Sequence, residues 1–472
     1  MVDYLPDIYT SDESLQYYTN EFEDIFQESF QDVWENCVLE SVKSIYNSMY
    51  LCLIVNVAFG LITSLGLPEI LFHWLSAMCG VYILVITLQS TKTLMVIYLA
   101  YILTYLIIIV VITLHKRLNQ TKPKEDIKRN TQIGFIASSS VVQYSLIIIF
   151  VLFEYILLDK EEWLEIRGIM MVFSMKLISL VTDQGMNDFP SFSEYCGYMF
   201  SNGNILFGPW ISYENYMYQM KYPTRKNIFW VLAILRALFL AVFFLSVSNC
   251  WASYLISDNS NRLLLGYKEA LSFRTSHYFI CYLSEALILA AGWKDNDYHF
   301  DTETWTLSVT DPWQIEFPTA LSIVVINWNK PMHAFFKKYI YRKWLPLGKF
   351  YAVFVTFLIS SLFHGFEIKV SLVLISLGIF SYLQVLVRDY ISQTFNMCVK
   401  IYPCKSCNHK IRPSSILCTL TKLIFSLLTV LDLIYLGVLM DQSTDEVGIY
   451  TKWNNLYFCS FWIMLINFLI VK

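Results

Sequence analysis

Residues 44–114 read SIYNSMYLCLIVNVAFGLITSLGLPEILFHWLSAMCGVYILVITLQSTKTLMVIYLAYILTYLIIIVVITL, and this stretch decides the fold. Its only Asp, Glu, Lys or Arg residues are Glu69 and Lys92. A helix of about 20 apolar residues crosses the ~30 Å hydrocarbon core of a bilayer, where every backbone polar group must find its partner inside the helix. The stretch therefore predicts three membrane spans, at 44–68, 70–91 and 93–114, joined by tight turns.

The composition of the whole 472-residue chain agrees with a membrane protein, since 56% of residues are hydrophobic, 17% aromatic and only 15% charged. Soluble domains carry about 45–50% apolar and about 25% charged residues. A net charge of −4 offers no basic field for phosphate, which excludes a nucleic acid partner.

We predict an all-α polytopic membrane protein with about nine to eleven transmembrane helices. Further spans are expected at 133–158, 227–256, 349–363, 369–387, 417–440 and 454–471. Weaker apolar stretches, which we expect to be re-entrant or broken, lie at 166–182, 195–218, 270–292 and 317–328.

Two regions are expected. Residues 1–43 form an acidic, lumenal or interfacial amphipathic segment, and residues 44–472 form a single membrane-embedded domain. The first forty residues carry eleven Asp or Glu and no Lys or Arg, so we expect no signal peptide there. The apolar face of the expected interfacial helix at 15–38 comprises Phe22, Phe26, Phe30, Val33, Trp34 and Cys37.

Charge in the loops predicts the orientation, because cytosolic loops are rich in Lys and Arg. Residues 115–129 carry six Lys or Arg, and 337–343 and 400–412 are also basic, which predicts that all three are cytosolic. The acidic segment at 441–446 is then lumenal, and His364 is expected at the lumenal end of the span 349–363.

The eleven cysteines are odd in number, and several, including Cys250, lie in apolar runs, which indicates small buried hydrophobes rather than a disulfide framework. The loop CVKIYPCKSCNH is different because it holds Cys398, Cys404, Cys407 and His409. These residues have three possible fates: a small zinc site, S-acylation, or ordinary reduced thiols.

Polar residues inside apolar runs are costly and are therefore candidates for function. His364 ends an apolar helix, where it could exchange a proton near neutral pH, and the alternative is a structural hydrogen bond to a final carbonyl. Asn329 lies at a polar break and offers an amide donor to a developing oxyanion. Trp328, Ser284, Glu285 and Ser361 could bind substrate, with helix packing as the alternative for each. We expect Arg236 and Asp432 to form structural ion pairs or to reach the membrane surface.

The ordered motifs resemble the membrane-bound O-acyltransferase family, in which an Asn and a His about 35 residues downstream mark the active site. Asn329 and His364 are 35 residues apart. The resembling stretches are SLVTDQG (179–185), FGPWISY (207–213), SFRTSHYFICYLSEA (272–286), WNKPM (328–332), SSLFHG (360–365), YLGVLMD (435–441) and YTKWNNLYFCSFW (450–462).

The resemblance implies helices around a central tunnel that admits acyl-CoA from the cytosol and the acceptor from the lumen. It implies that His364 is the general base and that Asn329 holds the thioester carbonyl, with no catalytic metal and no cofactor beyond palmitoleoyl-CoA as co-substrate. The branch it resembles transfers palmitoleoyl to a serine of Wnt proteins in the endoplasmic reticulum membrane. The alternatives are another secreted peptide or a lipid as acceptor, or a proton-coupled transporter, although no internal repeat supports the transporter.

Overall fold

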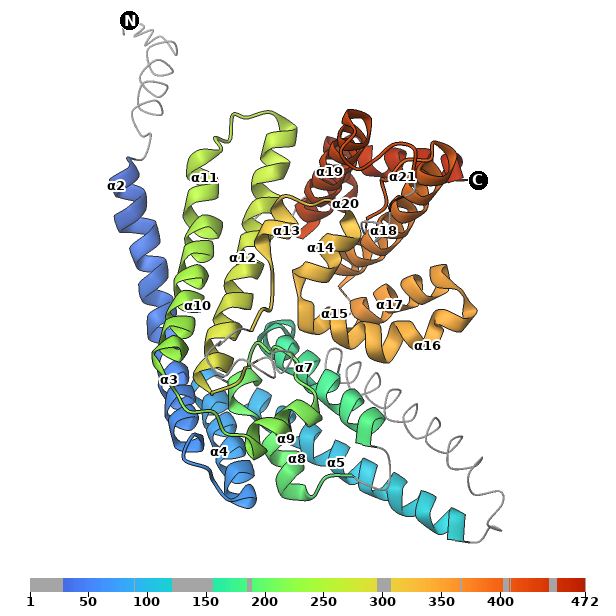
Figure 1. Cartoon of the computed structure of the whole chain (residues 1–472). Coiled ribbons are helices and arrows are strands. Elements are labelled where there is room, and N and C mark those ends of the chain that lie inside the picture. The colour runs from blue at the N-terminus through green and yellow to red at the C-terminus, as the bar shows by residue number, and fades with distance from the viewer. Residues whose placement is uncertain are drawn as a thin grey trace, which may run out of the picture.

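The structure is a computed structural model, and it describes residues 29–88, 90–120, 156–184, 189–294, 307–365, 367–401, 407, 409–440 and 448–471. Within these ranges the chain is helical and has no strand, apart from one isolated bridge between Met397 and Ile411. The expected all-α polytopic architecture is confirmed (Figure 1).

The α-helices of the described residues are α2 (Phe30–Val33), α3 (Leu39–Thr63), α4 (Glu69–Thr87), α5 (Thr91–Gln120), α7 (Lys160–Gln184), α8 (Phe192–Met199), α9 (Tyr213–Lys221), α10 (Ile228–Ser246), α11 (Ala252–Leu255), α12 (Arg262–Ala290), α13 (Pro312–Glu316), α14 (Leu321–Trp328), α15 (Lys330–Phe336), α16 (Arg342–Trp344), α17 (Lys349–Phe363), α18 (Ile368–Thr394), α19 (Ile416–Gly437), α20 (Ile449–Asn455) and α21 (Cys459–Val471). Single turns of π-helix are η1 (Trp34–Val38), η4 (Val247–Trp251) and η5 (Lys337–Tyr341), and 3₁₀ turns are η3 (Asn202–Asn204), η6 (Leu345–Leu347) and η7 (Val438–Met440).

Six helices of the described chain are long and apolar enough to cross a membrane, at Phe30–Thr63, Glu69–Thr87, Thr91–Leu114, Ile228–Leu255, Ile368–Thr394 and Ile416–Met440. Each corresponds to a span expected from the sequence. The expected span 133–158 lies almost wholly outside the described residues.

Two other expected spans differ from the prediction. α17 has 15 residues, so at 1.5 Å per residue it is about 22 Å long and falls short of the ~30 Å hydrocarbon core. The segment 454–471 is not one helix, because the chain bends by 76° between α20 and α21. Tyr457 and Phe458 adopt left-handed backbone angles at this bend, and such residues do not continue an α-helix.

The expectation that 166–182 and 270–292 are broken is wrong, since α7 and α12 run through them without interruption. Their charged side chains find hydrogen-bond partners in other parts of the protein and do not lie at breaks. Lys176 donates to the carbonyl of Tyr198 and to Asn204 Oδ1, at 3.0 and 2.7 Å. Arg274 forms two hydrogen bonds of 2.8 Å with Glu316. The other two stretches, 195–218 and 317–328, are broken as expected.

α10 and α12 pack side by side as an antiparallel pair that organises one half of the molecule (Figure 1). Ser248 and Ser272 exchange hydrogen bonds, each hydroxyl donating to the other's backbone carbonyl at 2.9 Å. Gly437, at the end of α19, lies so close to Ala270 that an added Cβ would meet the Ala270 Cβ at 2.6 Å. The carboxyl ends of the spans 228–255 and 416–440 therefore lie at the same depth.

A disulfide between Cys37 and Cys250 joins the start of the first span to this end of α10. Cys250 is thus not one of the unpaired small hydrophobes that the sequence indicated. The pairing arises because η1 packs against η4, with Val33 and Val38 buried around the two sulfurs. Residues 37, 250 and 437 accordingly share one face of the membrane domain, and the opposite ends of the same spans share the other.

The expected interfacial helix is described only from residue 29 onward. There, Ser29 caps α2 in a reciprocal pair with Asp32, and α2, η1 and α3 follow one another without a break. This part of the acidic segment is therefore the outer extension of the first span.

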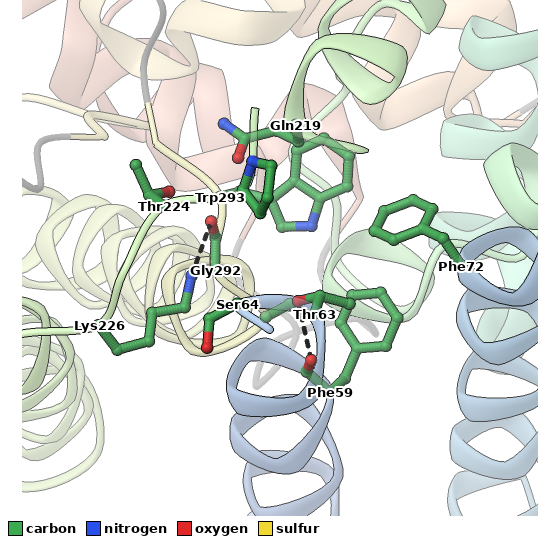
Figure 2. A pocket seen from close by; sticks show the side chains of 11 residues that line it. Phe59, Thr63, Ser64, Phe72, Gln219, Thr224, Lys226, Gly292 and Trp293 are labelled. Carbon is green, nitrogen blue, oxygen red and sulfur yellow. Dashed lines mark hydrogen bonds between the residues drawn. The ribbon is translucent and has the colours of Figure 1, made fainter. Parts of the chain in front are cut away.

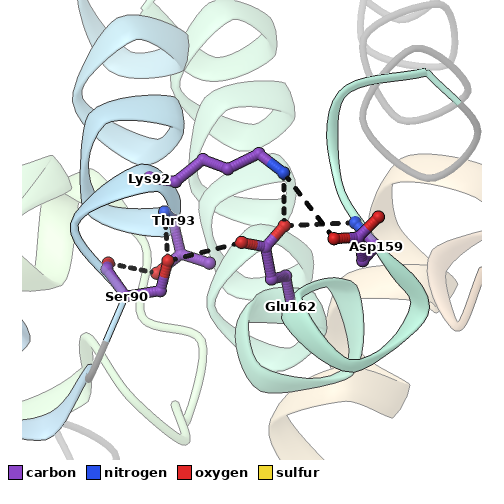
Figure 3. A network of polar contacts seen from close by, with 5 residues as sticks. All are labelled: Ser90, Lys92, Thr93, Asp159 and Glu162. Carbon is purple, nitrogen blue, oxygen red and sulfur yellow. Dashed lines mark hydrogen bonds and ion pairs between the residues drawn. The ribbon is translucent and has the colours of Figure 1, made fainter.

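α7 is anchored to α5 by a polar network at the start of both helices (Figure 3). Lys92 donates to Glu162 at 2.7 Å, and the Asp159 amide donates to the same carboxylate at 3.1 Å. The hydrogen bond from Lys92 holds the pKa of Glu162 below its usual value, and the Asp159 amide acts in the same direction. This anchor fixes the first turns of α7, which carry Arg167.

Candidate active site

Asn329 lies at the break between α14 and α15, where its backbone is extended, with φ −150° and ψ 94°. Pro331 follows in the first turn of α15, where a missing amide hydrogen costs nothing because that group has no partner within the helix. The Asn329 side-chain oxygen accepts from the Met332 amide at 3.0 Å, so this residue caps α15. Among the described residues nothing accepts a hydrogen bond from its Nδ2, which remains available as a donor.

A returning segment at 307–311 holds the break in place. The Lys330 amide donates to the Val309 carbonyl at 2.8 Å, and the Asp311 amide donates to the Asn327 carbonyl at 3.1 Å. Lys330 Nζ also donates to the Ser308 hydroxyl at 2.9 Å. These bonds satisfy backbone groups that the end of α14 would otherwise leave unpaired.

Trp328 packs against a histidine that the sequence reasoning missed. The rings of Trp328 and His277 stack with centroids 4.3 Å apart and planes 9° apart. His277 Nε2 lies 3.0 Å from the Trp328 carbonyl and 3.3 Å from Cys281 Sγ. His277 belongs to the quoted stretch SFRTSHYFICYLSEA, and an imidazole within that apolar run was the signal that could have marked it.

His364 follows Phe363, the last residue of α17, as the C-cap of that helix, and Gly365 comes next with φ +87°, a left-handed conformation that suits glycine at the end of a helix. The His364 carbonyl accepts from Arg167 Nη1 at 3.3 Å, and the same guanidinium reaches Glu367 at 3.1 Å. Among the described residues neither ring nitrogen of His364 has a hydrogen-bond partner. The structure therefore does not show the alternative role for His364, in which its ring bonds to one of the last carbonyls of α17.

α15, which begins after Asn329, packs on the end of α17 through Phe336 and Phe363, with ring centroids 5.6 Å apart. The break at Trp328–Asn329 thus contacts His277 of α12 on one side, and α15, which follows the break, packs on the end of the helix that His364 caps. No direct contact between Asn329 and His364 is present within the described residues.

The remaining expected substrate-binding residues have partners within the protein. Ser284 donates to the Cys281 carbonyl at 2.8 Å, and Ser361 donates to the Leu358 carbonyl at 2.7 Å. Glu285 is 1% exposed; it accepts from Arg236 at 2.7 Å and from the Val309 amide at 3.4 Å. These contacts fit the packing alternative, and substrate binding by these residues stays a prediction.

Arg236 forms the structural ion pair that the sequence predicted. Asp432 does not, since within the described residues no Lys or Arg lies within ion-pair distance of it. The Asp432 side chain lies instead with Ser460, Gln384 and Asn467 in a small pocket whose other lining residues are apolar.

A second small pocket lies elsewhere, between the end of α3 and the end of α12 (Figure 2). Lys226 reaches into it and donates to the Gly292 carbonyl at 3.4 Å. Burial, together with the smaller effect of the Lys294 charge, lowers the pKa of Lys226 to about 8. None of the expected site residues lines this pocket, so it is separate from the candidate active site.

Comparison with known proteins decides the family. Residues 81–430 match the membrane-bound O-acyltransferase family. The chain belongs to the membrane-bound O-acyltransferase family. All six expected site residues fall within the matched region.

Relatives within this family cover nearly the whole chain. The chain is 30% identical to the protein-serine O-palmitoleoyltransferase porcupine of Homo sapiens over 471 residues, which is 93% of this chain and 96% of the human protein. The Mus musculus protein of the same name is also 30% identical, over 93% of this chain. The Anopheles gambiae protein of that name is 33% identical over 66% of this chain and 69% of its own length.

Proposed function

We propose that this protein transfers a palmitoleoyl group from palmitoleoyl-CoA to a serine hydroxyl of a secreted Wnt-type protein. The observation that carries the proposal is full-length similarity to relatives named protein-serine O-palmitoleoyltransferase. The contact of His277 with Trp328, beside the Asn329 break, and the packing of α15 on the end of α17 before His364 support it. The proposal also places this multi-pass membrane protein in the endoplasmic reticulum, where secreted proteins meet a lumenal active site.

His364 acts as the general base. It takes the proton from the serine hydroxyl as the oxygen attacks the thioester carbonyl, and it passes that proton to the departing CoA sulfur as the C–S bond breaks. Both ring nitrogens of His364 lack partners within the described residues, so the base is free to exchange the proton. Positioned proton transfer contributes about 10²–10⁴ in rate.

Asn329 directs its Nδ2 amide at the thioester oxygen on which negative charge develops. Its Oδ1 is already engaged by the Met332 amide, so the cap orients the side chain and leaves the donor end for the substrate. A donor aimed in this way is worth roughly 2–4 kcal/mol in the transition state. His277 stacks on Trp328 and so holds in place the residue that precedes Asn329.

The two substrates arrive from opposite sides, acyl-CoA from the cytosol and the serine from the lumen. The basic loops 115–129, 337–343 and 400–412 favour a cytosolic location for those ends. The Cys37–Cys250 disulfide lies at the shared face of residues 37, 250 and 437, and disulfides persist in an oxidising lumen. The tunnel that would join both sides at His364 belongs to this proposal.

The test incubates the purified full-length chain with alkyne-labelled palmitoleoyl-CoA and one of three acceptors: a Wnt-type serine peptide, its Ser→Ala variant, or a lipid acceptor. Label on the serine peptide alone is the expected result. Label on the lipid alone would establish a different acceptor, and label on neither, with His364 and Asn329 intact, would overturn the proposal.

A further inference from the structure

The turn that follows α18 brings together two thiols and an imidazole. The ligand atoms of Cys398, Cys407 and His409 all lie within 4.8 Å of one another. Cys407 Sγ lies 3.4 Å from His409 Nδ1. In a tetrahedral zinc site, bond lengths of about 2.3 Å to sulfur and about 2.05 Å to nitrogen put neighbouring S and N about 3.6 Å apart and two sulfurs about 3.8 Å apart. A contraction of about 1 Å, within reach of side-chain rotation, brings the whole group to these values.

The backbone of the turn is fixed on both arms. The Cys398 amide donates to the Ile411 carbonyl at 3.1 Å, and the Ile411 amide donates to the Asn396 carbonyl at 3.2 Å. Asn396 adopts a left-handed φ of 50°, which Asn tolerates better than most residues. Because the two arms are bonded to each other, ligands on separate arms face one another before any ion binds.

His409 is oriented as metal-binding histidines are. Its Nε2 lies 3.2 Å from the Ser392 hydroxyl on α18, while Nδ1 faces Cys407. When one ring nitrogen donates to an outer acceptor, the other nitrogen keeps its lone pair for a cation. The Ser392 hydroxyl can accept from Nε2–H, and in that tautomer Nδ1 can act as the ligand.

The chemistry of the group favours zinc over a disulfide. Cys398 is 2% exposed and belongs to a small apolar cluster with Met397, Val399 and Cys418. Two thiolates and one neutral imidazole balance the charge of Zn²⁺, so the filled site is uncharged and suits this buried position. The turn precedes Ile416, at the opposite end of α19 from Gly437, and therefore lies on the face away from the Cys37–Cys250 disulfide.

We propose that Cys398, Cys407 and His409 bind one Zn²⁺ in a structural site that staples α18 to α19. Two thiolates and an imidazole are ligands that zinc prefers. Water takes the fourth position of the tetrahedron.

Hydrogen bonds connect the proposed zinc site to the candidate active site. Arg388 of α18 donates to the Val399 carbonyl beside Cys398 and to the Thr319 carbonyl before α14. Gln384 accepts from the Leu321 amide, the first residue of α14, at 2.8 Å. α14 ends at Trp328, so a turn held by zinc supports the helix that presents Asn329.

The experiment measures the metal content of the full-length chain, purified in detergent through a non-metal affinity tag without chelator. Inductively coupled plasma mass spectrometry should find about one zinc per chain. Cys398→Ser, Cys407→Ser and His409→Gln should each lose most of it. Cys418→Ser is the matched control, because Cys418 belongs to the same cluster but only donates to the Cys398 carbonyl, at 3.0 Å, and serine can make the same bond.

A thiol measurement on wild-type protein keeps the test independent of how the variants fold. Maleimide should label Cys407 slowly in the native protein and rapidly after 1,10-phenanthroline, as read by peptide mass spectrometry. Equal labelling with and without chelator, or zinc-free folded protein after incubation with zinc and desalting, would overturn the proposal. A hydroxylamine-sensitive acyl group on Cys407 would overturn it as well, because an acylated sulfur has no thiolate to bind the ion.

Discussion

The imidazole of His277 stacks on the indole of Trp328, with ring centroids 4.3 Å apart, and its Nε2 lies 3.0 Å from the Trp328 carbonyl. This contact joins α12 to the residue immediately before Asn329. A histidine in the middle of α12 is thereby tied to the break on which the proposed thioester contact depends. His277 is a positioning residue in this arrangement, since it acts through Trp328.

Removal of His277 should slow acyl transfer while His364 and Asn329 remain in the site. Displacing a reacting group by about 1 Å can cost up to ~10²-fold in rate, so His277→Ala should lower kcat by roughly ten- to a hundredfold. His277→Gln keeps an N–H donor for the Trp328 carbonyl and should recover part of the rate. The shape of the pH profile should match wild type in both variants, and a changed profile would instead assign His277 a proton-transfer role.

Replacement of His364 should remove the general base. His364→Ala is expected to lower transfer to the serine peptide by about 10²–10⁴ while acyl-CoA binding and the melting temperature stay close to wild type. The protein contact of His364 is made by its backbone carbonyl, which alanine retains. Transfer within about threefold of wild type would reject His364 as the base.

Six spans expected from the sequence correspond to helices long and apolar enough to cross a membrane, and the proposal of Asn329 and His364 as site residues also came from a local signal. An uncharged run of 20 residues is visible in one window, and the Asn329–His364 pair stands in a recognisable motif order. His277, the Cys37–Cys250 pair and the Glu285–Arg236 pair were not assigned together, because each depends on two helices meeting in space. α7 and α12 were read as broken for the same reason: Lys176 and Arg274 find their partners on distant segments.

The Arg236–Glu285 pair provides a test of a structural role for Glu285. Arg236→Leu leaves a carboxylate that is 1% exposed without its cation and should lower the free energy of unfolding by up to about 3 kcal/mol. Adding Glu285→Gln should restore part of that loss, because the neutral amide still accepts from the Val309 amide. The measurement is thermal unfolding of both variants with transfer rates on the folded fraction. A double variant that folds but no longer transfers the acyl group would indicate that Glu285 binds substrate.

The Cys37–Cys250 disulfide can be tested directly. Peptide mapping without reduction should recover Cys37 linked to Cys250, and Cys37→Ser should lower the free energy of unfolding by about 2–5 kcal/mol.

Single cysteines placed at 115–129 and 400–412 should react with an impermeant reagent from the cytosolic side of sealed microsomes, and one at 441–447 from the lumenal side. Labelling of 400–412 and 441–447 from the same side would contradict the proposed orientation.

The two ends of the Asn329 amide allow capping to be separated from catalysis. Oδ1 caps α15 by accepting from the Met332 amide at 3.0 Å, whereas Nδ2 is proposed to meet the thioester oxygen. Asn329→Asp keeps an oxygen at the cap and removes the donor, so its melting temperature should stay near wild type. Its transfer rate should fall by about 10²–10³, the cost of losing one oxyanion donor.

Asn329→Ala removes both ends and is the matched comparison. It should lose the same transfer rate and also about 1 kcal/mol of stability, the usual cost of an absent cap. Melting curves and single-turnover rates on the same samples separate the two effects, and binding of the serine peptide should be unchanged in both variants. If Asn329→Asp transfers normally while Asn329→Ala loses both stability and rate, then Asn329 acts only as the cap of α15, and the proposed chemistry depends on His364 alone.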